Sequence, residues 1–338
     1  MSSTIKTHRS SLRIYSIDYL RIVAFCGVVA LHTVSPDGEL STAINILSRF
    51  SVPYFFIIAG LFFNPSRPIR QKLISLGTIG CTAGTVYVIL GIFGITPWFT
   101  SLMGSDNIIN DLLSQIRTFL LWNSFPPAYP LWFIFALLYV YGVYGCLSFF
   151  GVSKSSIASF SLGLFFARTI FGEVLGVMSP QDVIMRSWLF LGLPCFSMGV
   201  ILRQHLNKLT SINSIALFVL AAIGIILSGI EYSLFGLQEC YIGMLLCTIV
   251  VIILCFKHPF SSLASKPFAS YVIGGRYCLV AYLVHYGVIC LLQGLLKYPF
   301  PMADGLYQIA LLVGTVSISL AVSLLISVGS GLDKQYDC

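Results

Sequence analysis

Long apolar runs recur along the whole chain, and no other feature constrains its fold as much. A helix needs roughly 20 mostly apolar residues to cross the hydrocarbon core of a bilayer. Only 9% of the 338 residues are charged, against about 25% in soluble domains, and the mean hydropathy is +0.92. We therefore expect an all-α bundle of about ten transmembrane helices, forming one membrane domain over residues 1–338. The predicted spans are 14–34, 48–63, 73–94, 131–150, 156–172, 185–203, 211–230, 241–256, 271–294 and 307–328.

The basic residues predict the orientation of these spans. With a cytoplasmic N-terminus, thirteen of the 19 Lys and Arg residues fall in cytoplasmic loops and tails. The positive-inside rule weighs these residues, so both termini are expected on the cytoplasmic side. The first run lacks a small-residue cleavage site and is followed by further spans, so it is expected to stay as a helix rather than act as a signal peptide. The net charge of +7 then faces anionic lipid, and no feature indicates nucleic-acid binding.

The segments between the predicted spans are short. The largest, 95–130, is expected to be an outer loop, in which paired prolines favour extended or turning chain. Segment 35–47 is expected to be a shorter polar outer loop. Most of the ten cysteines, among them Cys26, Cys81, Cys146, Cys195, Cys247 and Cys290, lie inside apolar runs, without a CxxC or Cys/His cluster. They are interpreted as small packing residues rather than metal or redox centres.

The first span, YLRIVAFCGVVALHT at 19–33, carries charged and titratable residues in an apolar helix. Eleven residues sweep three helical turns plus roughly 20°, so Arg21 and His32 share one stripe, about 16 Å apart. Asp18 lies within about 60° of that stripe. An arginine inside a span costs about 3 kcal/mol and usually faces the bundle interior or a substrate path. In the alternative, Arg21 reaches the inner interface and pairs with Asp18, and His32 is an outer interfacial residue.

The second span and the turn after it add basic residues. SRFSVPYFFIIAG places Arg49 at the outer end and Pro53 inside the helix, where it loosens the hydrogen-bond ladder. RPIR then places Arg67 and Arg70 three residues apart on the cytoplasmic side. Paired guanidinium groups suit phosphate recognition. They equally suit lipid headgroups and simple anchoring at the inner surface.

Later spans contain further candidates. RSWLFLGLPCFSMG places Arg186 just ahead of a span, and GGRYCLVAYLVH places Tyr282 and His285 on one helical face. Trp132 in PLWFIF is interpreted as an aromatic residue of the membrane interface. Glu231 lies beside the outer loop that follows the seventh span, where a solvated position is the simplest interpretation.

Four of these stretches together resemble the acyltransferase-3 family of integral membrane O-acyltransferases. They are RIVAFCGVVALH, with an arginine and a histidine separated by ten residues, then SRFSVPYFFIIAG, RSWLFLGLPCFSMG and GGRYCLVAYLVH. The resemblance covers nearly the whole chain, including the number of spans. Three positions depart from the family pattern: Ile22 replaces a glycine, Ala59 a serine, and Pro130 a histidine that commonly precedes LWF.

The resemblance implies an activity and its partners. Members transfer an acyl group, usually acetyl, from cytoplasmic acyl-CoA to a hydroxyl of an extracytoplasmic glycan or its lipid-linked precursor. The expected setting is the bacterial inner membrane, with acyl-CoA as co-substrate, no permanently bound cofactor and no metal. Some relatives carry a C-terminal esterase-like domain, whereas this chain ends about ten residues after its last predicted span. Direct transfer or a separate partner is therefore expected.

The residues above fit roles in such a reaction. His32 is predicted to be the catalytic base or a covalent acyl carrier. The acyl-CoA phosphates are expected near Arg21, Arg67 and Arg70, with Asp18 holding Arg21. Tyr282 and His285 are predicted to support the site, and the acceptor side is predicted to contain Arg49, Arg186 and Glu231.

A membrane transporter or flippase for a glycan or small solute is the alternative function. Transporters often contain internal repeats with matching broken helices in both halves. The sixth span, SWLFLGLPCFSMGVILR, has no counterpart of the Arg21 and His32 pair. This difference favours the enzyme.

Overall fold

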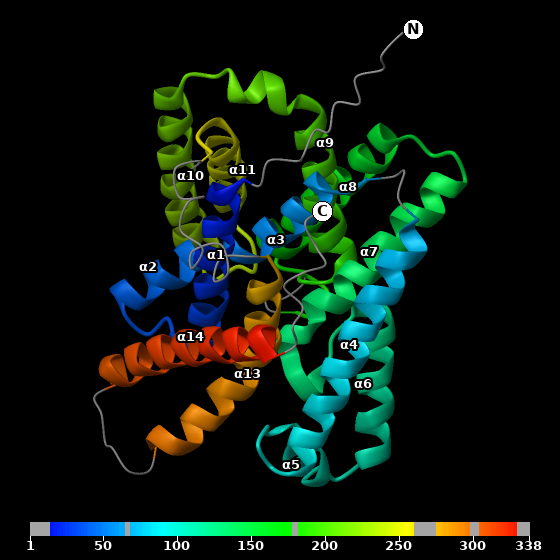
Figure 1. Cartoon of the computed structure of the whole chain (residues 1–338), viewed down its shortest axis with the longest axis vertical. Helices are drawn as coiled ribbons and strands as arrows, with labels where there is room; N and C mark the ends of the chain where they lie inside the picture. The colour runs from blue at the N-terminus through cyan, green and yellow to red at the C-terminus, as the bar shows by residue number, and fades with distance from the viewer. Residues whose placement is uncertain (1–13, 65–67, 178–181, 260–274, 298–303, 330–338) are drawn as a thin grey trace, which may run out of the picture.

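The computed structural model describes residues 14–64, 68–177, 182–259, 275–297 and 304–329 (Figure 1). Within these ranges the chain is helical and contains no strand. Nine of the described helical segments are long and apolar enough to cross a membrane. The predicted all-α, polytopic bundle is therefore confirmed.

Each predicted span falls on a helix of the described chain, except that residues 271–274 of the ninth span lie outside the described residues. The helices are α1 (Tyr15–Thr33), α2 (Glu39–Ser48), α3 (Ser51–Leu61), α4 (Ile69–Ile92), α5 (Trp98–Met103), α6 (Ile108–Trp122), α7 (Trp132–Phe149), α8 (Lys154–Arg168), α9 (Leu193–Thr210), α10 (Ser214–Phe235), α11 (Ile242–Lys257), α13 (Gly275–Lys297) and α14 (Asp304–Gly329). A 3₁₀ turn η1 (Pro126–Leu131) and two π-helical turns, η2 (Thr169–Val174) and η3 (Trp188–Gly192), complete them. Helix α11 has 16 residues, fewer than a span usually needs.

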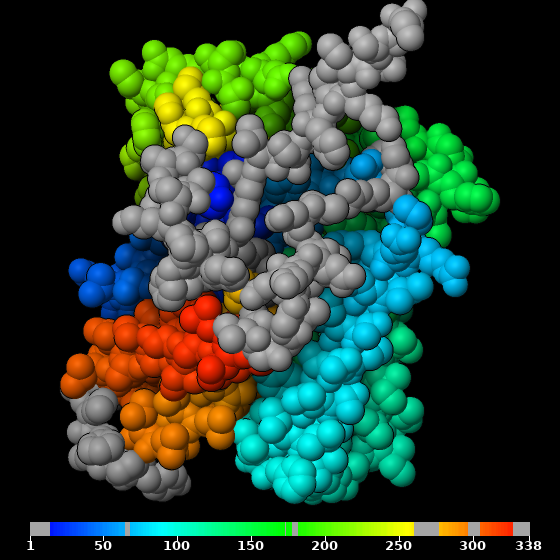
Figure 2. All heavy atoms as spheres, viewed as in Figure 1, coloured from blue at the N-terminus to red at the C-terminus, as the bar shows by residue number. Residues whose placement is uncertain are grey.

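Helix α1 lies at the centre of the bundle. It packs against α2, α3, α11, α13 and α14 (Figure 1). Its residues Ala24, Phe25 and Val29 are completely buried. Figure 2 shows α4 and α14 on opposite flanks of the molecule, and α4, α10 and α14 expose large apolar side chains. Outer helices that expose apolar side chains suit contact with lipid, whereas α1 is packed against five other helices.

Helices α3 and α9 cross at very short range, at glycines of two of the sequence motifs. A Cβ atom on Gly60 would lie 1.9 Å from the main-chain oxygen of Phe196. A Cβ on Gly199 would lie 2.0 Å from the main-chain oxygen of Ile57. Small residues let membrane helices approach closely. This crossing therefore brings the SRFSVPYFFIIAG and RSWLFLGLPCFSMG segments together.

The prediction of a loop over 95–130 was wrong. Most of this segment forms α5 and α6, and its paired prolines lie in η1. The Asn107 side chain accepts a hydrogen bond from Asn110 N and caps α6. Apolar residues of α6 recur three and four positions apart, which is typical of a helix, although Asp and Asn residues at its start suggested a loop. Helix α6 runs beside α7, where the rings of Phe119 and Phe135 lie 4.8 Å apart.

The segment before the second span is also helical. Residues 39–48 form α2 rather than the expected polar loop, and a break at 49–50 separates α2 from α3. Pro53 does not interrupt α3, because it is the third residue of the helix. A proline in the first turn removes an N–H that has no partner within the helix. Arg49 stands at this break, and its side chain lines the same cavity as His32 near the end of α1.

Candidate functional site

A cavity of about 170 Å³ lies at the C-terminal end of α1. Its lining comes from α1, α3, α7, α13, η1 and the segments before η3 and α11. The charged and titratable residues in the lining are His32, Arg49, Arg186 and Glu239. Segments more than two hundred residues apart in the sequence, such as those of His32 and Tyr282, therefore contribute to one polar cavity inside an apolar bundle.

His32 and His285 lie side by side at this cavity. Their ring centroids are 5.7 Å apart and their planes differ by 38°. His32 is exposed to the cavity and makes no hydrogen bond to the described residues. His285 is fully buried, and its Nδ1 contacts the main-chain oxygen of Tyr282. Because a carbonyl oxygen only accepts, Nδ1 carries the proton, and Nε2 of His285 is left buried with no partner among the described residues.

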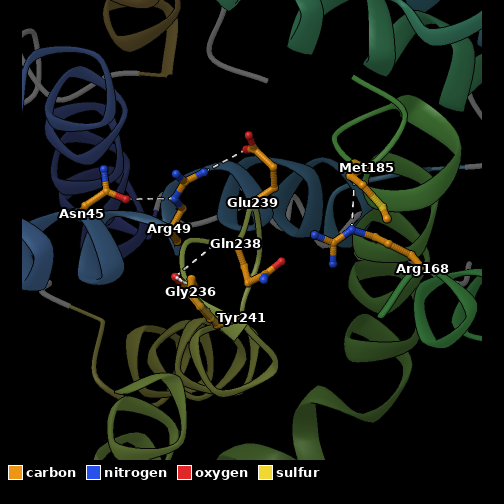
Figure 3. Close-up of polar contacts among 8 residues, drawn as sticks. All are labelled: Asn45, Arg49, Arg168, Met185, Gly236, Gln238, Glu239 and Tyr241. Atoms are coloured by element: carbon orange, nitrogen blue, oxygen red, sulfur yellow. Dashed lines mark hydrogen bonds and ion pairs between the residues drawn. The ribbon is translucent and has the colours of Figure 1, made fainter. Parts of the chain in front are cut away.

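Arg49 is held in an ion pair at the cavity wall (Figure 3). Its Nη1 donates to Glu239 Oε2 at 2.9 Å, and its Nε donates to Asn45 Oδ1 at 3.2 Å. The two charged side chains are 16% and 19% exposed. Tyr241 Oη orders the loop that carries Glu239, by donating to the oxygen of Gly236 at 3.1 Å. The charge of Arg49 is therefore compensated within the protein.

Arg186 also lines the cavity, but its charge is not compensated by the described residues. The side chain is half-buried, and no described group accepts a hydrogen bond or ion pair from its guanidinium. Its Nε is fully buried without a partner in the described chain. Arg186 and Arg49 thus differ sharply, although both line one cavity.

The chain on both sides of Arg186 is fixed by side chains from other elements. The buried Arg168 donates from Nε to the main-chain oxygen of Met185 at 3.1 Å (Figure 3). The buried Asn123 accepts from Trp188 N at 2.8 Å and donates to the oxygen of Trp132 at 3.0 Å. Arg186 is therefore placed by its main chain and not by a partner for its charge.

Aromatic side chains form the rest of the cavity wall. Phe55, Phe133 and Tyr282 contact one another, with ring centroids 5.7 to 6.4 Å apart. Tyr282 Oη donates to the main-chain oxygen of Pro130. Trp132 is buried in this wall, so its interpretation as a residue of the membrane interface was wrong. The departure from the family pattern at Pro130 thus falls in the cavity itself.

The other charged group of α1 lies outside this cavity. Arg21 forms an ion pair with Asp18, as the sequence alternative allowed. The Asp18 side chain is 5% exposed and that of Arg21 is 23% exposed. Phe25, fully buried, lies between Arg21 and His32 on α1 and contacts the His285 ring edge-on at 6.1 Å. The two ends of α1 are therefore separate environments.

The remaining predicted site residues lie elsewhere. Arg70 is exposed near the start of α4, and Arg67 lies outside the described residues. Glu231 does not line the cavity: its Oε1 accepts from Gly243 N at 3.2 Å, at the start of α11. A carboxylate at a helix N-terminus is stabilised by the free N–H groups there. The structure therefore places Glu239, and not Glu231, beside Arg49.

Three residues of the site were missed by sequence reasoning. Glu239 stands 190 residues from Arg49, so the sequence gives no sign of their pairing. Trp132 is an aromatic residue at the end of a predicted span, where tryptophans of the membrane interface are common, so its position in the cavity wall was not predicted. Asn123 follows a helix and adopts a left-handed conformation with φ of 55°, which is a common role of asparagine. Its contacts to two other elements are visible only in three dimensions.

The fold and the cavity together define a polytopic helical membrane protein with a histidine open to a buried polar cavity. The model of the acyltransferase domain of the acyltransferase-3 family matches residues 14–328. The chain belongs to this family, and the family supports membrane acyltransferase activity. Neither a curated protein nor a solved structure matches the chain.

Proposed function

We propose that this protein transfers an acyl group, most simply acetyl, from cytoplasmic acyl-CoA to a hydroxyl of an extracytoplasmic or lipid-linked glycan. The proposed location is the bacterial inner membrane, with both termini in the cytoplasm. The observation that carries the proposal is His32, an imidazole without a hydrogen-bond partner in the described chain, open to the cavity at the end of α1. Family membership supports the acyl transfer.

His32 acts as the general base in this proposal. Its free ring nitrogen takes the proton of the acceptor hydroxyl as the oxygen attacks the thioester carbonyl. The new C–O bond forms, the C–S bond breaks, and the proton passes to the departing thiolate to give free CoA. A covalent acyl-histidine is the alternative route, in which His32 attacks the thioester first. Both routes need an unpaired ring nitrogen at His32.

His285 orients His32 in this mechanism. Since Nδ1 of His285 donates to the Tyr282 carbonyl, its Nε2 carries a lone pair. That lone pair is buried beside His32 without another partner in the described chain. In this proposal the His32 ring turns to donate one N–H to this lone pair, which leaves the other nitrogen of His32 free to accept a proton. His285 is thus a positioning residue for the base.

The donor is proposed to bind at the opposite end of α1. In this proposal Arg21, Arg67 and Arg70 supply the cationic groups for the CoA phosphates. Because CoA is anionic, its phosphates stay at the aqueous surface while the pantetheine arm reaches toward His32. Phe25 and the aromatic cavity wall lie along this path. They must move aside for the arm to pass.

The test is O-acylation of an acceptor glycan by the purified protein in proteoliposomes, measured by mass spectrometry together with release of free CoA. His32→Ala is expected to lose activity by about 100-fold or more. His205→Ala is the matched control, because His205 is exposed on α9 and does not line the cavity. Full acylation by a correctly inserted His32→Ala protein contradicts the proposed mechanism. Glycan movement without CoA release would instead identify a transporter.

A further inference from the structure

The charges in the wall of the His32 cavity do not balance. The lining contains two guanidinium groups, Arg49 and Arg186, and one carboxylate, Glu239. Glu239 is engaged by Arg49 at 2.9 Å. With neutral His32, the described lining has a formal charge of +1, which resides on Arg186.

Arg186 is built into the cavity and is not a flexible surface group. Arg168 and Asn123 hold the residues on either side of it through buried hydrogen bonds. Its Nε is buried, and its guanidinium has no acceptor among the described residues. A side chain that only anchored the protein at an interface would not need this support.

An unpaired guanidinium is expensive in a mostly apolar site. A ligand that brings a carboxylate or phosphate group removes this penalty, because the forked donors of arginine match two oxygens. Neutral sugars offer hydroxyls only, and cannot compensate the charge. The cavity therefore selects for ligands with an oxyanion.

We propose that the acceptor presents an oxyanion to Arg186 while its hydroxyl reaches His32. The oxyanion is the carboxylate of an acidic sugar or the phosphate of a lipid-linked sugar. This inference rests on the proposed function, and it adds the substrate class: the acceptor is anionic close to the hydroxyl that is acylated. Arg49, with its charge already compensated by Glu239, contributes shape and hydrogen bonds but little net attraction.

The inference is tested first by binding, independently of catalysis. The detergent-purified full chain is titrated with three pairs of probes: glucuronate and glucose, farnesyl phosphate and farnesol, and CoA and pantetheine. Thermal stabilisation should be larger for glucuronate or farnesyl phosphate than for its neutral partner. Arg186→Gln should remove that preference and weaken binding of the anionic probe by about 30-fold, and Arg186→Lys should restore part of it.

Two further variants separate charge from structure. Glu239→Gln frees Arg49 and adds one positive charge to the cavity, so it should strengthen binding of the anionic probe. Arg117→Gln, an exposed position on α6 outside the cavity lining, should leave all probes unchanged. Arg186→Gln should lower the affinity for the anionic probe and Glu239→Gln should raise it. A loss of folding would lower the affinity in both variants, so it cannot produce this pair of results.

The outcomes distinguish this inference from the proposed function. Equal binding of anionic and neutral probes by the wild type and Arg186→Gln overturns the inference, as does an Arg186 effect confined to CoA. Acyl transfer to neutral and anionic glycans that falls equally in Arg186→Gln also overturns it, because Arg186 would then act on the reaction itself. If the wild type acylates a glycan and releases CoA in the proteoliposome assay, the proposed function stands, whether or not Arg186 binds an anionic probe.

Discussion

The two ends of α1 hold similar residue types in opposite states. At one end Asp18 and Arg21 form an ion pair, with the carboxylate almost fully buried. At the other end His32 is unpaired within the described chain, and Arg186 beside the same cavity is unpaired as well. The comparison shows that a polar residue inside a membrane helix is not by itself a reactive one. The two ends differ in whether neighbouring residues supply an ion-pair or hydrogen-bond partner for the polar side chain.

The paired end is expected to contribute mainly to stability. Removing one member of a buried ion pair leaves the other charge without compensation. A side chain that faces a cavity without a partner makes no ion pair or hydrogen bond in the folded protein, so its removal breaks none. Variants at the two ends of α1 should therefore affect different measurements.

The largest effect on stability is expected from Arg21→Ala. It removes the Arg21 guanidinium from the buried Asp18 carboxylate and should lower the free energy of unfolding by about 3 kcal/mol, measured by SDS titration in detergent micelles. His32→Ala should change it by less than about 1 kcal/mol. A double variant, Asp18→Asn with Arg21→Met, should recover most of the loss. Equal destabilisation by Arg21→Ala and His32→Ala would break the comparison between the two ends.

An intermediate effect is expected from Asn123→Ala, at the open end. The change leaves Trp188 N and the Trp132 carbonyl without their buried partner, which should cost about 2 kcal/mol of unfolding free energy. Asn123→Gly tolerates the left-handed backbone and loses the same two hydrogen bonds. Both variants should lower acyl transfer together with stability, since Arg186 is no longer held in place. If stability falls but acyl transfer is unchanged, the Asn123 contacts do not position the site.

The smallest effect on stability is expected from Arg70→Gln. Arg70 is exposed at the start of α4, so the free energy of unfolding should change by less than about 0.5 kcal/mol. Acyl-CoA affinity, measured by titration with labelled acyl-CoA, should fall by about 3- to 10-fold because one phosphate contact is lost. Arg117→Gln is the control at another exposed arginine. Unchanged acyl-CoA affinity would exclude Arg70 from the proposed donor site.

Several features of the fold were predictable because they depend on hydrophobicity alone. The ten predicted spans all coincide with helices, since long apolar runs can satisfy their backbone in lipid only as helices. The predictions for 35–47 and 95–130 failed for a different reason. Polar residues at the ends of α2 and α6 resemble loop residues, although one of them, Asn107, caps a helix.

The candidate site was predictable in part. The first helix identified Arg21 and His32 from their shared stripe, and the motif around residue 285 placed a second histidine in the candidate set. Sequence reasoning chose Glu231 for the acceptor side, whereas the structure places Glu239 in the cavity. Both glutamates flank one loop, and only the tertiary packing, in which α2 contacts α10 and Arg49 pairs with Glu239, decides between them.

The sequence by itself determined the helical membrane fold, because the energy of exposing backbone and charge to lipid depends on residue type and spacing. It also determined that α1 would have to shelter an arginine and a histidine. The tertiary structure decided which polar groups are paired. Ion pairs and hydrogen bonds act over a few ångströms, and the atoms of Arg49 and Glu239, or of Asn123 and Trp188, come within that range only after the helices pack.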